Sequence, residues 1–149
     1  MPKHDSTADT LKHMRRVQQL LGVMARNLMQ RGEVHDDSKL GEVEKPLFDE
    51  MTPKLKELKY GTDEYKASLA SLGPALKHHY SLNSHHPEHF TNGVAGMNLL
   101  DLVEMLCDWK AASERSKDGD FQKSIAIGID RFDIEPQLAS ILRNSVALI

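Results

Sequence analysis

The chain has 149 residues, 40% of them apolar, which is enough for one domain with a single hydrophobic core. Its formal net charge of -3 and isoelectric point of about 6.2 argue against a general nucleic-acid binder. The one cysteine, Cys107, excludes an intrachain disulfide, and no apolar run approaches the roughly 18 residues of a membrane span. We therefore expect a soluble, cytoplasmic protein that does not bind membranes.

Helical spacing of apolar residues recurs along the chain, and no segment alternates as a strand does. Gly32 is expected to end the first helix, and Pro74 to kink or restart the third. A histidine-rich loop should precede the fourth helix. We expect helices over residues 6–30, 40–59, 62–80 and 97–116, a loop over 81–96, and interrupted helix over 121–149. The sequence thus predicts an all-α, single-domain helical bundle with about five or six helices.

His13 lies on the apolar face of the first expected helix, four residues before Val17. A histidine in this position is usually a core or boundary residue that is hydrogen-bonded to a carbonyl. Neutral imidazole is also the commonest metal ligand among side chains. The position of His13 therefore permits a buried metal ligand.

The connection after the first helix contains the stretch HDDSK, residues 35–39. A polar turn, with Asp36 or Asp37 as a helix N-cap, is one interpretation. The other is a metal site, because adjacent His35 and Asp36 can bind one divalent ion or bridge two. Lys39 would then follow one turn later and face the anionic group of a substrate.

Histidines gather in the stretch HHYSLNSHHPEH. Five of the eight histidines fall within 12 residues: His78, His79, His85, His86 and His89. A solvated loop with adventitious metal affinity would explain them. Two histidine pairs flanking an Asn-Ser turn favour a site that binds metal.

Acidic residues form a stripe on the fourth expected helix, at Asp101, Glu104 and Asp108. Such a stripe is normally solvated, but Asp108 stands between Cys107 and Trp109 in a strongly apolar helix. A buried carboxylate is costly unless it is paired or bound to metal. Asp108 is therefore the best carboxylate ligand outside the His-Asp pair.

These elements follow the order His, His-Asp, His, His-His, Asp. In this order the chain resembles, from about residue 13 to residue 115, the HD-domain superfamily of metal-dependent phosphohydrolases, which are all-helical. HDDSK is similar to the HDxGK form of their cyclic-dinucleotide phosphodiesterases, SHHPEH to their HHE segment, and DWKAASER to their closing helix. Ser38 replaces the glycine, and HFTNGVAG replaces the DGxGYP element, which argues against that particular activity. The chain is also similar to a small group of compact HD-like proteins, some of them phage-encoded.

The resemblance implies a ligand set and a division of the chain. Residues 1–149 would form one HD-like domain, with a metal-site core at about 13–115 and C-terminal helices at 121–149. One to three divalent ions of Mn, Fe, Co, Ni or Zn would suit mixed His and carboxylate ligation. The implied core ligands are His13, His35, Asp36 and Asp108, with His79 and His86 extending the set to a second ion and His85 serving a third.

The implied reaction is hydrolysis of a nucleotide or similar small phosphate ester by metal-activated water. Asp36 and Lys39 would be catalytic, and Lys39 would contact the scissile phosphate. Arg115, seven residues past Asp108, is expected two turns further along the same helix, where it would grip a distal phosphate. Glu88 or Glu104 would act as acid or base, or hold a histidine. The alternatives are a di-iron oxygenase of the HD type and a helical interaction or regulatory protein with a structural or vestigial metal site.

Overall fold

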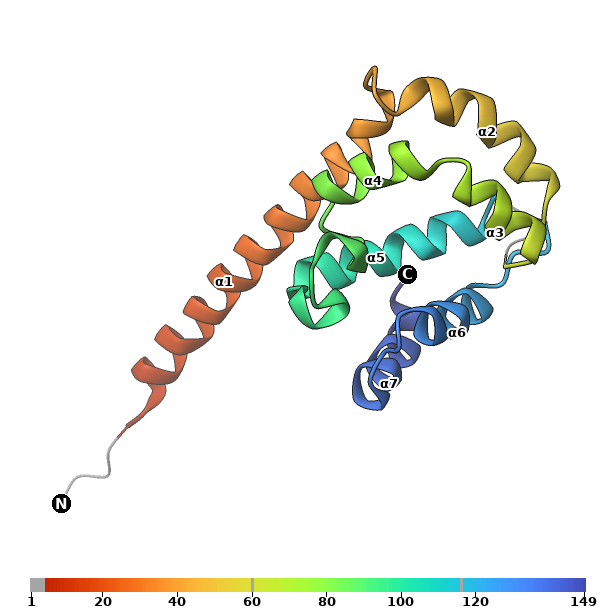
Figure 1. Cartoon of the computed structure of the whole chain (residues 1–149). Helices are drawn as coiled ribbons and strands as arrows, with labels where there is room; N and C mark the ends of the chain where they lie inside the picture. Colours follow the sequence, from red (N-terminus) through yellow and green to blue (C-terminus); the bar gives the residue numbers. More distant parts are fainter. Residues whose placement is uncertain (1–4, 60, 116) are drawn as a thin grey trace. The chain divides into compact units, whose positions relative to one another are not determined.

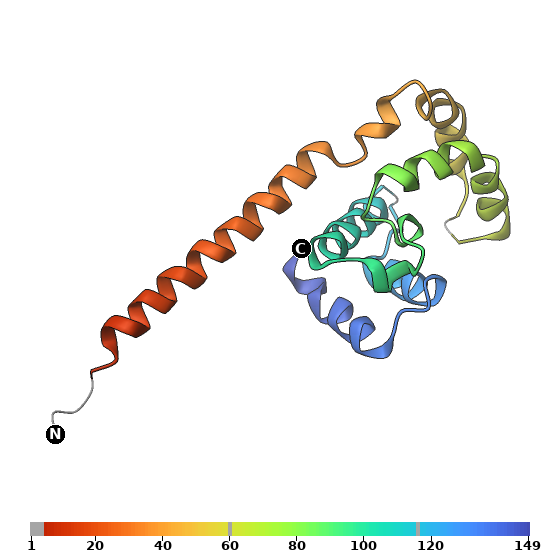
Figure 2. The same ribbon diagram turned by 60° about the vertical axis from the view of Figure 1, so that its left-hand side comes forward.

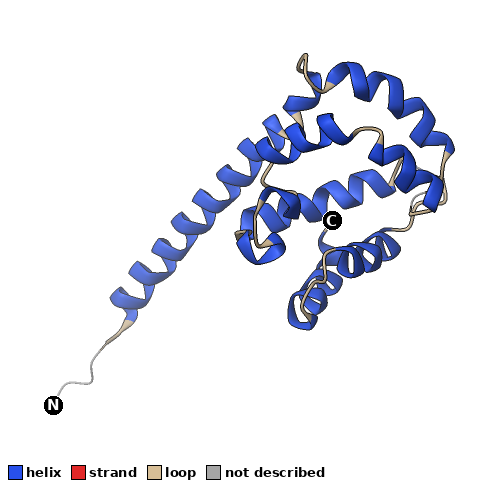
Figure 3. Cartoon of the chain, in the orientation of Figure 1, coloured by secondary structure: helices blue, strands red, loops and turns tan. Residues whose placement is uncertain are grey.

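The computed structural model describes residues 5–59, 61–115 and 117–149, and these residues contain seven α-helices and no strand (Figures 1 and 3). The prediction of an all-α protein is therefore confirmed, while the expected five or six helices are seven among the described residues, because the segment 62–80 forms two helices. The helices are α1 (Thr7–Val34), α2 (Lys45–Glu57), α3 (Asp63–Ala70), α4 (Gly73–Leu82), α5 (Leu99–Ser113), α6 (Phe121–Arg131) and α7 (Pro136–Asn144). Four short 3-10 helices join them: η1 (Asp37–Leu40), η2 (Pro87–His89), η3 (Gly93–Gly96) and η4 (Ser145–Leu148).

Several helix boundaries differ from the expected ones. The prediction that Gly32 ends the first helix is wrong, since α1 continues to Val34. One glycine inside a helix costs only about 0.5–1 kcal/mol relative to alanine, which neighbouring turns can offset. Pro74 lies in the first turn of α4, where proline is tolerated, and therefore divides the expected third helix into α3 and α4. Pro53 does not end α2.

The chain divides into two compact units, one ending at Val34 and the other spanning His35–Ile149. The described part of the first unit is essentially α1, a helix of 28 residues with no buried residue. Its apolar side chains recur at helical spacing, as the sequence predicts. The division into one domain over the full chain stays a prediction.

The second unit has its core where α5, α6 and α7 meet, and two views place α6 beside both α5 and α7 (Figures 1 and 2). The buried side chains of this core are Leu106, Phe121, Ile125, Ile134, Ala139 and Leu142. Gly128 allows α6 to approach α5 closely, because a Cβ atom there would lie 2.2 Å from the Trp109 ring. The helix α5 is thus fixed along one side by apolar packing.

A capping box fixes the start of α5. The Asn98 side chain accepts hydrogen bonds from the first turn, and the Asp101 carboxylate accepts one from the Asn98 backbone N–H. Asp101 is buried and also accepts a hydrogen bond from Ser84 Oγ at 2.6 Å. Asp101 is therefore a structural residue that ties α5 to the histidine-rich loop. None of the helices in the described part of the chain combines the length and hydrophobicity needed to cross a membrane.

Candidate metal centre

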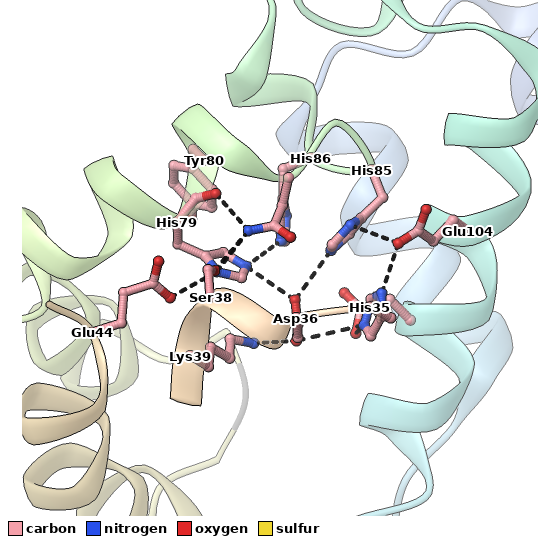
Figure 4. Close-up of polar contacts among 12 residues, drawn as sticks. His35, Asp36, Ser38, Lys39, Glu44, His79, Tyr80, His85, His86 and Glu104 are labelled. Carbon is pink, nitrogen blue, oxygen red and sulfur yellow. Dashed lines mark hydrogen bonds and ion pairs between the residues drawn. The ribbon is translucent and has the colours of Figure 1, made fainter. Parts of the chain in front are cut away.

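Asp36 lies at the centre of a cluster of polar side chains (Figure 4). Its backbone is in the left-handed region, with φ 61° and ψ 14°, and it stands directly before η1. Only a few per cent of residues other than glycine adopt such angles, and they are frequent at functional sites. The Asp36 side chain makes no capping hydrogen bond to η1. Asp36 therefore occupies the N-cap position of η1, as one interpretation of the sequence predicts, but its side chain does not cap the helix.

The two carboxylate oxygens of Asp36 face different neighbours. Oδ1 lies 3.1 Å from His79 Nε2 and 3.5 Å from His85 Nε2. Oδ2 lies 3.5 Å from His35 Nε2 and 2.5 Å from Lys39 Nζ. Burial alone would raise the pKa of Asp36, but the imidazoles of His79 and His85 and the Lys39 ammonium hold it well below its usual range. Asp36 is therefore ionised and positioned to serve two groups of ligands.

Two buried atoms of this cluster have no hydrogen-bond partner among the residues that the structure describes. They are Asp36 Oδ1 and His85 Nε2, which lie 3.5 Å apart without forming a hydrogen bond. The 3.1 Å contact of Oδ1 with His79 Nε2 is an ion-pair contact and also lacks hydrogen-bond geometry. Buried polar groups without a partner are rare and costly, and binding of an ion or a water molecule commonly explains them. One is an anionic oxygen and the other an imidazole nitrogen, which are both donors that transition metals accept. The donor set therefore fits a divalent cation.

Possible ligand atoms fall into two groups, within each of which they lie no more than 4.8 Å apart. The first group consists of Asp36, His79, His85 and His86, and the second of His35, His85 and Asp108. The Nε2 atom of His85 carries one lone pair, so His85 can bind only one ion at a time. A carboxylate can bridge two ions through its two oxygens. Asp36 is therefore the residue suited to connect two ion positions.

His35 and Asp108 interact directly, with His35 Nε2 3.6 Å from Asp108 Oδ1. The nearby Asp108 carboxylate raises the pKa of His35 to about 9; Glu104 and Asp36 also raise this pKa, whereas burial lowers it. Burial would raise the pKa of Asp108, but the contact with His35 lowers it. Without a metal, a proton on His35 thus offsets part of the negative charge of the Asp108, Glu104 and Asp36 carboxylates.

His86 is the ligand candidate that is most clearly neutral. Burial, together with the charges of His85 and His79, lowers the pKa of His86 to about 3. Its Nε2 atom lies 3.0 Å from His79 Nε2, and its ring lies against the ring of Tyr80, with centroids 4.9 Å apart. A neutral imidazole offers the lone pair that binds metal.

Glu44 and Glu104 hold ligand histidines from the side away from Asp36. Glu44 is fully buried and contacts His79 Nδ1 at 3.0 Å and His78 Nδ1 at 2.7 Å. Burial would raise the pKa of Glu44, but its histidine partners lower it. Glu104 contacts His35 and His85, as the hypothesis that it holds a histidine required. Sequence reasoning missed Glu44, since no motif distinguishes it from its exposed neighbours.

Ser38 also has a place in this cluster. Its Oγ lies 3.0 Å from His79 Nδ1 and accepts a hydrogen bond from Asn83 Nδ2 at 2.9 Å. The serine that replaces the glycine of the HDxGK form therefore supports a ligand histidine. A glycine at this position would lack the hydroxyl.

A family model for DUF5662, a family of unknown function, matches residues 3–148 of the chain. The chain belongs to the DUF5662 family. No curated protein and no solved structure matches it. Because the function of DUF5662 is unknown, membership in this family leaves the resemblance to HD-domain phosphohydrolases an expectation.

The remaining predicted site residues of this DUF5662 chain fall outside the two ligand groups. His13 lies on α1 in the first unit and is exposed, and its role as a ligand stays a prediction. The expectation that Arg115 continues the helix of Asp108 is wrong, because α5 ends at Ser113 and Arg115 lies in an exposed turn. Glu88 pairs with Arg131 at 2.7 Å. Glu88 therefore contacts an arginine, whereas Glu104 contacts two ligand histidines.

The structure also separates the paired histidines by their contacts. His79 is buried and belongs to a ligand group, whereas the His78 side chain is 37% exposed and contacts Glu44. Both His85 and His86 belong to the first group. His89 Nδ1 contacts the Tyr80 carbonyl at 2.7 Å. The cluster thus contains six of the seven predicted metal ligands.

Proposed function

We propose that this protein is a metal-dependent phosphohydrolase that acts on a nucleotide or a similar small phosphate ester. The observation that supports the proposal best is the pair of buried atoms, Asp36 Oδ1 and His85 Nε2, that form no hydrogen bond with any described residue. A divalent cation would supply the partner that both atoms lack. The order of the ligands along the chain, similar to that of HD-domain phosphohydrolases, supports phosphoester hydrolysis as the reaction.

The residues of the two ligand groups would hold up to two ions, and Asp36, whose two oxygens face the two groups, would be the shared carboxylate. His79, His85 and His86 would hold one ion with Asp36, and His35 and Asp108 would hold the other. This mixture of imidazole and carboxylate ligands suits Mn, Fe, Co, Ni or Zn better than Mg or Ca. When bound, such an ion polarises phosphoryl oxygens and lowers the pKa of water to about 7.

Lys39 supplies the cationic side chain that a phosphate ester requires. Its Nζ atom contacts Asp36 and lies 5.3 Å from the centre of the Phe48 ring, and its side chain is 32% exposed. A positioned ammonium stabilises the negative charge that develops on the phosphate in the transition state. Since Arg115 does not continue α5, the proposal assigns phosphate binding to Lys39, and a role for Arg115 stays a prediction.

The test compares the wild-type protein with Asp36→Asn. Asparagine tolerates the left-handed backbone and has nearly the same size, so a change in fold would not explain a loss of metal. Each protein is stripped of metal, reloaded separately with Mn, Fe or Zn, analysed by plasma mass spectrometry, and then assayed for phosphate release from nucleotides. We expect one to three equivalents of metal and turnover in the wild type, and a loss of both in Asp36→Asn.

Two results would overturn the proposal. If the wild type takes up no metal, the site assignment fails. If metal binds but no phosphate ester is hydrolysed, the site has another role. Oxygen consumption by the iron-loaded protein would then favour the oxygenase, and its absence would favour a structural or regulatory metal site.

A further inference from the structure

Glu104 differs from the other carboxylates of the cluster in that one of its oxygens contacts two imidazoles. Glu104 Oε1 lies 2.8 Å from His35 Nδ1 and 3.0 Å from His85 Nδ1 (Figure 4). A protonated carboxyl group could donate to only one of them. Two Nδ1–H groups that both donate to the same oxygen satisfy both contacts. The arrangement therefore fixes the tautomer of two histidines at once.

This tautomer determines which nitrogen of each ring can bind a metal ion. When each imidazole is neutral, as a metal ligand must be, a proton on Nδ1 leaves the lone pair on Nε2. His35 Nε2 lies near Asp36 Oδ2 and Asp108 Oδ1, at 3.5 and 3.6 Å. His85 Nε2 lies 3.5 Å from Asp36 Oδ1. Glu104 thus directs one imidazole to each oxygen of Asp36.

The packing of the two rings explains why one residue can do this. The His35 and His85 rings lie with centroids 4.4 Å apart and an interplanar angle of 39°. The His85 side chain is 2% exposed and that of Glu104 is 12% exposed, so little water reaches the shared oxygen. Glu104 is itself held on α5, one turn before Asp108. The position of α5 therefore determines the orientation of both imidazole rings through the Oε1 atom of Glu104.

We propose that Glu104 is a positioning residue shared by the two ligand groups, so that binding of an ion to either group depends on it. The proposal rests on the metal site of the proposed function. Partners that orient ligand histidines usually change metal affinity by 10- to 100-fold when they are removed. For a residue that serves one histidine, only one ion is weakened. For Glu104, we expect both to be weakened.

The experiment compares Glu104→Ala with Glu104→Gln. Glutamine keeps an oxygen at the position of Oε1 that can accept from both imidazoles, while alanine keeps none. Glu114→Ala is the matched control, since Glu114 follows the same helix, pairs with Lys110 and has a side chain that is 62% exposed. Competition titrations with Zn give the stepwise dissociation constants, and plasma mass spectrometry gives the stoichiometry. Spectra of protein labelled with 15N-imidazole histidine report the Nδ1–H protons of His35 and His85.

We expect Glu104→Ala to weaken both Zn-binding steps by at least about 10-fold. Both slowly exchanging Nδ1–H signals should also disappear, before and after Zn is added. Glu104→Gln should restore the signals and most of the affinity, and Glu114→Ala should match the wild type. Wild-type affinity in Glu104→Ala, or weakening of one step alone, would overturn the proposal.

The outcomes separate this proposal from the proposed function. If the wild type binds Zn and Glu104→Ala behaves as expected, Glu104 has the positioning role even if no phosphate ester is hydrolysed. If wild-type and variant proteins bind Zn equally, the role of Glu104 fails and the hydrolase proposal stands. If the wild type binds no Zn, both proposals fail.

Discussion

The helix α5 has two sides that are stabilised in different ways. On one side, Leu106 is buried in the core, and Trp109 packs against Gly128 of α6. On the other side, Glu104 and Asp108 reach the histidines around Asp36. Apolar packing depends on shape and adds up over many small contacts. The polar side depends instead on a complete set of partners, because each buried polar group that loses its partner is costly.

This difference implies that the two sides can be altered separately. A change on the core side should lower the free energy of unfolding and leave the affinity for metal unchanged, provided that the protein still folds. A change on the cluster side should weaken metal binding, and it should lower the free energy of unfolding only where it leaves a buried polar group without a partner. Four substitutions or treatments test the comparison, in decreasing order of their expected effect on stability.

The largest expected effect is that of Leu106→Ala. Leu106 is 7% exposed, and removing a buried leucine side chain leaves a cavity that costs about 2–5 kcal/mol. Urea denaturation of the metal-free protein measures the change. Ile141→Ala is the control, because Ile141 is 53% exposed and should cost much less. If Zn affinity falls together with stability in folded Leu106→Ala, the two sides of α5 are not independent.

Addition of metal should have the next largest effect. An ion that binds only the folded protein stabilises it by about 2.7 kcal/mol when its concentration is 100 times the dissociation constant. Thermal unfolding with and without Zn measures this gain, and subsequent addition of a chelator should reverse it. Asp36→Asn should show no gain. An equal gain in Asp36→Asn would place the bound metal elsewhere.

Gly128→Ala should have a smaller effect on the core side. The added Cβ would overlap the Trp109 ring, so α6 or the ring must move, and such overpacking costs about 1–3 kcal/mol. The control is Gly32→Ala in α1, where an added Cβ meets no atom within 4 Å. The control should be neutral or slightly more stable, because alanine is the better helix former. Equal stability of the two variants would show that the α5–α6 contact adapts easily.

The two sides also differ in how well the sequence predicts them. Apolar spacing predicts the helical character of most segments. Residues of two short motifs lie in the cluster: His35, Asp36, Ser38 and Lys39 of HDDSK, and His85 and His86 of HHPEH. Pro74 marks a point of division, as the sequence predicts, because proline restarts a helix for a purely local reason. The effect of Gly32 is predicted less well: α1 continues past it, because the small cost of one glycine is offset by the neighbouring helical turns. Local rules thus succeed where one strong residue decides the conformation.

Contacts between distant segments were harder to predict. Glu44 approaches His79 across 35 residues of sequence, and no spacing indicates that this glutamate is fully buried. The pairing of Glu104 with two histidines depends on where α5 packs, which the core on its other side determines. Arg115 shows a different error: the sequence predicts a helix that includes Arg115, but α5 ends two residues earlier, at Ser113.

Lys39→Met should have the smallest effect on stability and the clearest effect on function. Methionine keeps an apolar chain that can pack against the Phe48 ring and removes only the charge that contacts Asp36. The partly exposed ion pair contributes about 1 kcal/mol or less, so unfolding should change little. If the ammonium acts on the phosphate, metal content should be retained while turnover falls by about 100-fold or more, as for removal of one stabilising donor. Unchanged turnover in a metal-loaded Lys39→Met variant would remove Lys39 from the reaction, whereas loss of metal would show that its role is to hold Asp36.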